Sequence, residues 1–302
     1  MIRRAVIAIG ILGASLLGFL GFQNARLSRG EPLSPPPAGA LRVATLNVHY
    51  LNLLADNGPW SRVGWERRRA ALGAAVKALS ADVIAFQEME SFAGGSISRD
   101  NLVLDYLVDA NPLLSAAAVG DPIVFPSTQP IFYRADRLTV RDEGWFFFSQ
   151  TPDVAYSRGF DGAWPSFASW ARFAERDGRA FTVINVHFDY SSWENRRQSA
   201  QLVAAFAAQR IAQGETVIVA GDLNALHGSR TMAILEAGGL TFGDVPGATF
   251  HFNRGFSLFG AIDHIGHGPG ATPLGLPRVL RQRFGDVWPS DHYPVVADFS
   301  LR

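Results

Sequence analysis

The hydrophobic and polar positions after residue 40 alternate between short apolar runs and longer segments with helical spacing. The apolar runs predict buried strands over residues 41–48, 82–86, 181–186, 216–220, 261–265 and 294–299. Residues 145–148 and 167–173 are expected to pair as two further strands. Helical spacing and good helix formers predict helices over residues 65–79, 194–212 and 229–236. Many short strands, few helices and several long loops favour two packed sheets flanked by helices.

The N-terminal segment has a different pattern. Two arginines precede an uncharged apolar run over residues 5–22, which is long enough to cross a bilayer. The run is longer than the usual apolar region of a signal peptide, and no A-x-A cleavage site follows it. An uncleaved signal anchor over residues 1–24 is therefore favoured over a cleaved signal peptide. The Pro-rich composition of residues 25–40 predicts a linker to a single body over residues 41–302.

The position of the two arginines predicts where the body lies. Positive residues flanking an apolar segment stay on the cytoplasmic side, so the body is expected outside the cytoplasm. An uncleaved segment would hold the chain in the cell membrane, whereas cleavage would give a secreted or periplasmic protein. We expect the body itself to be monomeric.

Composition narrows the chemistry that the chain can perform. The hydrophobic fraction of 48% and the charged fraction of 18% are those of a folded globular protein. A formal net charge of zero excludes a protein that binds nucleic acid through charge alone. The chain has no cysteine, which excludes disulfide scaffolds, zinc ribbons, iron–sulfur clusters and thiol nucleophiles. A metal would need Asp, Glu, Asn or His ligands, which favours hard ions such as Mg²⁺ or Mn²⁺.

Six of the predicted strands carry Asn, Asp, Glu or His at one end. A single polar strand end is usually a cap or a turn residue, whereas six in one chain indicate side chains that meet in one cleft. In chain order these residues are Asn47, Gln87, Glu88, Asn185, His187, Asp189, Asp222, Asn224, Asp263, His264, Asp291 and His292.

This set resembles the signature of the endonuclease/exonuclease/phosphatase superfamily, whose members have the DNase I-like fold. The matching residues are Asn47, Gln87–Glu88, His187, GDLN at 221–224, Asp263 and SDH at 290–292. Further stretches resemble a bacterial branch of small hydrolases in that superfamily: IFYR at 131–134, GWFFFSQTPD at 144–153 and WARF at 170–173. The resemblance implies an α/β (α+β) fold, a four-layer α/β/β/α sandwich with two mostly antiparallel sheets between helices.

The resemblance also implies a metal and a base. Glu88 would be the principal ligand of Mg²⁺ or Mn²⁺, with Asn47 beside it and Asp291 nearby or bound through water. Because Mg²⁺ takes few carboxylates and keeps several waters, this sparse set suffices. Asp222 would accept the proton of the attacking water, and Asn224 would orient that water or the phosphate.

The remaining roles concern the phosphate. The resemblance implies that His187 and His292 donate to phosphoryl oxygens and that Asp263 holds the tautomer of His292. Tyr133 matches a phosphate-contacting tyrosine. Further candidates for substrate binding are Asn185, Asp189 and Arg134.

Some positions leave alternatives open. Glu90 lies on the same face of an extended chain as Glu88 and is a rival metal ligand. His264 stands where the family commonly has a tyrosine. The arginines at 67–69 are expected to be solvated. Four histidines are expected to be bystanders: His49, His227, His251 and His267.

The expected function is that of a divalent-metal-dependent phosphodiesterase or nuclease, in which water attacks a phosphate ester in line with the P–O bond that breaks. A nucleic acid, a phospholipid or an inositol phosphate is the expected substrate, since the superfamily acts on all of these with one core. One alternative is a phospholipase C-like enzyme or inositol-phosphate phosphatase that acts at the membrane. Another is a catalytically inactive binding module.

Overall fold

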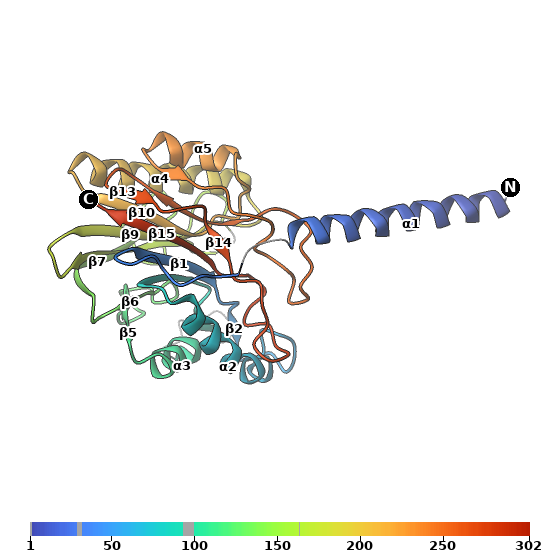
Figure 1. Cartoon of the computed structure of the whole chain (residues 1–302), viewed down its shortest axis with the longest axis horizontal. Coiled ribbons are helices and arrows are strands. Elements are labelled where there is room, and N and C mark those ends of the chain that lie inside the picture. The colour runs from blue at the N-terminus through green and yellow to red at the C-terminus, as the bar shows by residue number, and fades with distance from the viewer. Residues whose placement is uncertain (1, 29–31, 93–99, 163) are drawn as a thin grey trace.

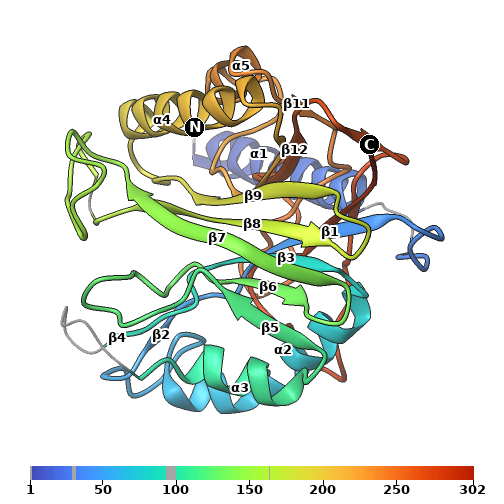
Figure 2. The same cartoon turned by 90° about the vertical axis from the view of Figure 1, so that its left-hand side faces the viewer.

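Two mixed β-sheets pack face to face, and helices cover the outer face of each sheet (Figures 1 and 2). This computed structural model describes residues 2–28, 32–92, 100–162 and 164–302. The layers follow the order helix, sheet, sheet, helix, which confirms the predicted α/β/β/α sandwich.

The first sheet joins both ends of the body. Its strand order is β13 (Ala271–Pro273), β15 (Val295–Leu301), β1 (Leu41–Asn47), β3 (Val83–Gln87), β6 (Ile131–Arg134) and β5 (Leu114–Ala117). A short strand, β14 (Arg278–Val279), also pairs with β15. The strands β1 and β3 are parallel, and the other pairs of this sheet are antiparallel.

The second sheet has the order β11 (Thr241–Phe242), β12 (Asp263–His267), β10 (Thr216–Asp222), β9 (Ala180–His187), β8 (Phe167–Glu175) and β7 (Leu138–Phe147). Its only parallel pair is formed by β9 and β10. A small parallel pair, β2 (Leu51–Asn52) with β4 (Ser91–Phe92), lies outside both sheets.

Strand side chains alternate between two apolar layers. On β1, Val43 faces the core between the sheets, and Leu46 faces the helices α2 (Arg62–Leu79) and α3 (Leu102–Ala110). On the other sheet, Val219 faces α4 (Trp193–Ala212) and α5 (Arg230–Ala237). Strands with both faces covered are apolar throughout, which explains the continuous apolar runs in the sequence.

Most predicted elements are present, with a few shifts. The strand expected over 261–265 begins two residues later, because the main chain of Ile262 forms hydrogen bonds with Leu223 and Thr249. The sequence patterns did not predict α3 or β5. The N-terminal helix α1 (Ile2–Leu27) continues into the segment expected to be a linker, so residues 25–27 are helical.

The helix α1 extends away from the body and contacts it at one end (Figure 1). The main-chain oxygen of Leu27 accepts a hydrogen bond from the amide of Ala248, at 2.9 Å. The side-chain oxygen of Asn24 accepts another from the amide of Ser257, at 2.7 Å. Within the described residues, no helix has the length and apolar character required for a membrane span.

A buried polar network joins the two sheets. Gln87 on β3 donates through Nε2 to Oδ1 of Asn185 on β9, at 2.7 Å. The amide nitrogen of Asn185 donates to the main-chain oxygens of Phe86 and Gln129, and Thr45 donates to Oε1 of Gln87. Asn185 is therefore a structural residue, which corrects its assignment to substrate binding. It faces the same way as His187 but lies two residues deeper, where the first sheet covers it.

The assignments of Tyr133 and Arg134 to the substrate also need correction. In the antiparallel pair of β3 and β6, Tyr133 lies opposite Val83, four residues or roughly 13 Å from Gln87. Its ring packs on Phe173 in the core between the sheets, with centroids 5.3 Å apart. Arg134 forms an ion pair with Asp136. The strand β6 runs away from the edge where β3 ends, and so carries both residues to the opposite end of the sheet.

Replacing Asn185 with Ala should destabilise the fold. The change removes the partner of Gln87 and of two main-chain oxygens, so we expect the free energy of unfolding to fall by about 2–4 kcal/mol. Urea denaturation measures the loss. The matched control is Asn57→Ala at an exposed asparagine, which should cost no more than about 0.5 kcal/mol. Equal effects of the two changes would contradict a structural role for the network.

Candidate functional site

The strand ends converge at one edge of the sandwich because of the strand register. In the first sheet, Asn47 pairs with Gln87 at the carboxyl ends of two parallel strands. In the second sheet, Asp222 pairs with His187 on one side and with Asp263 on the other. The register therefore places these side chains at one end of each sheet, and packing of the sheets brings the two ends together.

Asn47 connects carboxylates from the two sheets. Its Nδ2 donates to Oε1 of Glu88 at 3.1 Å and to Oδ2 of Asp222 at 3.2 Å. Its Oδ1 accepts the main-chain N–H of His49 at 3.0 Å and keeps a second lone pair. The buried Asn47 thus holds the metal-ligand candidate Glu88 and the base candidate Asp222 next to each other.

Glu88 occupies the turn that follows β3, with a φ angle of 54°. Its Oε2 accepts the main-chain N–H of Tyr50 at 3.1 Å, and its Oε1 lies 3.9 Å from Nε2 of His187. The side chain is 23% exposed and remains open to solvent. Glu88, and not its rival Glu90, is the residue that contacts Asn47. Burial, with the neighbouring charge of Glu88, raises the pKa of Glu90 to about 7.

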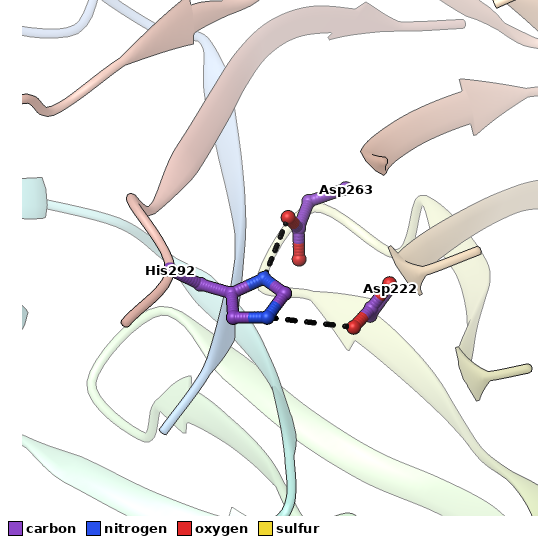
Figure 3. A group of neighbouring side chains, drawn as sticks. All are labelled: Asp222, Asp263 and His292. Carbon is purple, nitrogen blue, oxygen red and sulfur yellow. Dashed lines mark hydrogen bonds and ion pairs between the residues drawn. The ribbon is translucent and has the colours of Figure 1, made fainter. Parts of the chain in front are cut away.

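His292 lies between two aspartates (Figure 3). Its Nδ1 is 2.9 Å from Oδ2 of Asp263, and its Nε2 is 3.8 Å from Oδ2 of Asp222. Burial disfavours the charged ring, but the carboxylates of Asp263, Asp222 and Asp291 outweigh it and raise the pKa of His292 well above its ordinary value. The imidazolium therefore donates from both nitrogens and directs one N–H into the site.

Asp222 lies in the centre of the group. Its Oδ1 accepts the main-chain N–H of Asn224 at 2.9 Å, and its Oδ2 is 3.6 Å from Nε2 of His187. Burial, reinforced by the charge of Asp263, raises the pKa of Asp222 to about 6, against the lowering effect of His292 and His187. A carboxylate with a pKa close to neutrality is well suited to accept a proton.

Asn224 and Asp189 shape the loops beside the base. Asn224 has a φ angle of 46°, and its amide nitrogen donates to the main-chain oxygen of Phe188 at 2.9 Å. Oδ1 of Asp189 accepts the main-chain N–H groups of Ser191 and Ser192 at 2.7 and 2.8 Å. Asp189 therefore stabilises the turn that leads into α4, and Asn224 joins the loops after β9 and β10.

Asp291 lies beside a histidine that sequence reasoning missed. His49 was expected to be a bystander, yet it is buried and its Nδ1 lies 3.7 Å from Oδ1 of Asp291. Burial opposes ionisation of Asp291, but His292 and His49 hold its pKa below the ordinary value. Oγ of Ser290 donates to the main-chain oxygen of Asn47 at 2.7 Å and joins this segment to β1. His49 lies beyond the end of β1 with a φ angle of 61°, so the strand period gave no signal for it.

Arg68, on the helix α2, binds the same segments. It is buried, which corrects its expected solvation, and its guanidinium donates to the main-chain oxygens of Val48, His49 and Pro289 at 2.7, 2.5 and 3.2 Å. Burial lowers the pKa of Arg68 to about 10, so it remains charged at neutral pH. It thereby ties α2 to the loop after β1 and to the segment that leads into β15.

Two of the other histidines, His264 and His251, have structural surroundings. Nε2 of His264, in the position commonly occupied by tyrosine, contacts the main-chain oxygens of Ala225 and Ala261 at 3.0 and 3.1 Å. His251 stacks on Tyr293 with ring centroids 4.1 Å apart. These contacts fix loops around the site and leave neither ring in the position of His187 or His292.

Among the described residues, two groups of side chains have the donors for a metal. The ligand atoms of Asp222, Asp263 and His292 lie within 4.8 Å of one another, but His292 already donates to Asp263 and all three residues are buried. Mg²⁺ favours oxygen ligands and keeps several waters. The partly exposed Glu88, with Asn47, fits these demands better than a closed group that includes an imidazole.

The chain matches the model of the Endonuclease/Exonuclease/phosphatase family over residues 44–292. This range contains every site residue described above, and the chain belongs to that family. By family, it is a hydrolase of phosphate esters. The two-sheet sandwich accordingly has the DNase I-like fold.

Solved structures from Bacteroides thetaiotaomicron are similar over nearly the whole body. An endonuclease/exonuclease/phosphatase family protein is 25% identical, with a TM-score of 0.71 over 89% of this chain and 100% of its own. A mannosyl-6-phosphatase is 26% identical, with a TM-score of 0.72 over 86% and 100%. Sphingomyelinase C from Streptomyces griseocarneus, 18% identical with a TM-score of 0.59 over 88% and 100%, shows the shared fold alone. No curated protein matches the chain.

Replacing Arg68 with Met should loosen the site and the fold together. Three buried carbonyl groups lose their partner, so we expect the free energy of unfolding to fall by about 3 kcal/mol or more, measured by urea denaturation. The matched control is Arg69→Met on the same helix, where a surface ion pair with Glu66 contributes at most about 1 kcal/mol. A similar loss in both variants would show that the three carbonyl contacts of Arg68 contribute little.

Proposed function

We propose that the protein is a divalent-metal-dependent phosphodiesterase that hydrolyses a P–O bond by in-line attack of water. The observation that carries the proposal is the position of Asp222, which lies between His187 and His292 and is joined to Glu88 through Asn47. A base, two imidazoles and a set of hard oxygen ligands in one cluster are the groups that phosphoester hydrolysis requires.

Glu88 would hold Mg²⁺ or Mn²⁺ with Asn47, and Asp291 would bind it directly or through water. The bound cation would supply charge stabilisation at the phosphate oxygens. Two features support this role. The main-chain N–H of Tyr50 binds one oxygen of Glu88, and the pKa of Asp291 is lowered. Glu88 is thereby oriented, and Asp291 is kept ionised.

Asp222 takes the proton of the attacking water in this proposal. Its orientation is set by the N–H groups of Asn224 and Asn47, which bind one oxygen each. The pKa of about 6 leaves Asp222 ionised at neutral pH and still basic enough to accept a proton. Asn224 would orient the water or the phosphate from the adjoining loop.

The two histidines supply N–H groups for the charge that develops on the phosphoryl oxygens. His292 is charged and is held in place by Asp263, so its Nε2–H points towards Asp222 and the reacting phosphate. His187 approaches from the neighbouring strand, and its side chain is 27% exposed. The complete set favours an active enzyme over an inactive binding module.

A lipid or inositol phosphate is the second candidate substrate class, beside a nucleic acid. Exposed aromatic side chains near the site favour it, as do the apolar side chains that α1 exposes. In this proposal α1 anchors the chain in the cell membrane with the body outside the cytoplasm. The mannosyl-6-phosphatase neighbour adds a sugar phosphomonoester to the substrates that need testing.

Replacing Asp222 with Asn should remove the base and leave the shape of the site intact. We expect kcat to fall at least ~10²-fold, the low end for general-base catalysis, with the melting temperature little changed. The loss is measured from initial rates on a phosphodiester that the unmodified chain hydrolyses. The control is Asp136→Asn, which lies in the ion pair with Arg134 and should keep its rate. Near-normal turnover of the Asp222 variant would exclude it as the base.

Removing the principal metal ligand should abolish metal binding. We expect Mg²⁺ or Mn²⁺ to raise the melting temperature of the full chain, because binding to the native state alone stabilises it. The Glu88→Ala variant should lose this rise, whereas Glu66→Ala, at an exposed glutamate paired with Arg69, should keep it. An undiminished rise in Glu88→Ala would contradict the ligand assignment.

The reaction class is tested on a panel of substrates with the full chain and its Glu88→Ala variant. Full chain and Glu88→Ala are incubated with Mg²⁺ or Mn²⁺ and single- or double-stranded DNA, RNA, sphingomyelin, phosphoinositides, inositol phosphates and mannose 6-phosphate. Products are identified by mass. Cleavage of a nucleic acid that depends on Glu88 would establish a nuclease, and cleavage of lipid or inositol phosphates alone would establish the second candidate.

A further inference from the structure

We propose that the loop over residues 247–262, which we name the aromatic loop, binds the surface of a phospholipid bilayer. The inference rests on the proposed function, because it assigns the site a substrate presented at that surface. Three phenylalanines of the loop expose large fractions of their side chains: Phe252 (40%), Phe256 (51%) and Phe259 (37%). Exposed apolar groups concentrated in one segment mark an interaction surface.

Three rings of the aromatic loop form a cluster. Phe250 and Phe252 have centroids 4.4 Å apart, and Phe259 lies 6.0 Å from Phe250 and 5.9 Å from Phe252. Phe252 and Asn253 have φ angles of 58° and 55°, in the left-handed region that is costly for side chains other than glycine. The backbone is thus held in a strained turn that leaves the ring of Phe252 exposed.

The charge of the aromatic loop suits the phosphate groups of lipids. Residues 247–262 contain no Asp or Glu, although the chain has 27 acidic residues. The one Arg or Lys of this segment is Arg254, and it is exposed. Aromatic rings beside a basic side chain are typical of protein surfaces that lie in the interface of a membrane.

The aromatic loop adjoins the helix that carries the other exposed apolar surface. The N–H of Ala248 donates to Leu27 and the N–H of Ser257 donates to Asn24, so the loop contacts the end of α1 at two points (Figure 1). Further along α1 the exposed apolar side chains are Ile11, Leu12, Leu16, Leu17, Phe19 and Phe22. One bilayer can therefore cover both the helix and the loop.

The aromatic loop also adjoins the catalytic groups. The centroid of the Phe250 ring lies 5.0 Å from that of His292, and the main-chain N–H of His251 donates to the main-chain oxygen of Asp291 at 2.8 Å. Oγ1 of Thr249 accepts the N–H of Asp263 at 3.2 Å. A loop resting on a bilayer would hold the site beside the phosphates of the lipid head groups, which a nucleic acid in solution does not require.

The absence of cysteine allows a direct test. A single thiol is introduced in the full chain at exposed apolar positions, as Phe256→Cys, Leu16→Cys or Leu113→Cys, and labelled with an environment-sensitive fluorophore. Leu113 is 65% exposed and lies between α3 and β5 in the chain. These two elements lie on the side of the body away from α1 (Figure 1). The probes are vesicles of phosphatidylcholine with or without phosphatidylglycerol.

We expect vesicles to shift the emission of the label at Phe256→Cys to shorter wavelength and to leave the label at Leu113→Cys unchanged. Arg254→Glu should reduce the shift on vesicles that contain phosphatidylglycerol. A shift at Leu16→Cys without one at Phe256→Cys would overturn the proposal, because the helix would then bind without the loop. No shift at any position would overturn it as well.

Two further measurements separate the membrane-binding result from the catalytic assignment and from any effect of the cysteine substitution on folding. Binding does not require turnover, so the labels are also placed in the Asp222→Asn chain, where the same shifts are expected even if the proposed reaction is wrong. Circular dichroism identifies a labelled variant that has not folded. In that case Phe252→Cys replaces Phe256→Cys, and an unshifted label there would count against the proposal in the same way.

Discussion

The hydrogen bond between the side chains of Gln87 and Asn185 joins the two sheets directly behind the site. Each sheet alone presents only part of the chemistry, because Glu88 follows a strand of one and His187 ends a strand of the other. The amide pair links these strands, and its remaining polar atoms are satisfied by Thr45 and main-chain oxygens. A buried network with every member paired specifies one arrangement of the layers.

The site concentrates negative charge, and its surroundings compensate for it. Asp222 and Asp263 are buried, and Asp291 is partly buried. Burial disfavours the charged form of a carboxylate unless cations lie nearby. His292 lies between the first two and lowers the pKa of the third, while the buried charge of Arg68 lies in the same region. The balance leaves Asp222 with a raised pKa and Asp291 with a lowered one, so neighbouring carboxylates are suited to different tasks.

Several residues of the site were identifiable from sequence because their position on a strand is a local property. Asn47, His187 and Asp222 end apolar runs, and the register of the parallel pairs carries such ends to a common edge. The same reasoning failed for Tyr133, because β6 is antiparallel and its direction depends on a distant partner. It failed for Asn185 because this residue, on a strand of the second sheet, is covered by the first sheet.

The apolar runs, the absence of thiol chemistry and the family signature depend on residue identity and order alone, so they can be read directly from the chain. Which polar residues meet depends on the folded arrangement of the elements. His49 lies beside Asp291, and Arg68 binds the carbonyls of two separate loops, through contacts between segments far apart in the chain. No local pattern encodes such contacts, because they arise from the packing of helices and sheets after each element has formed.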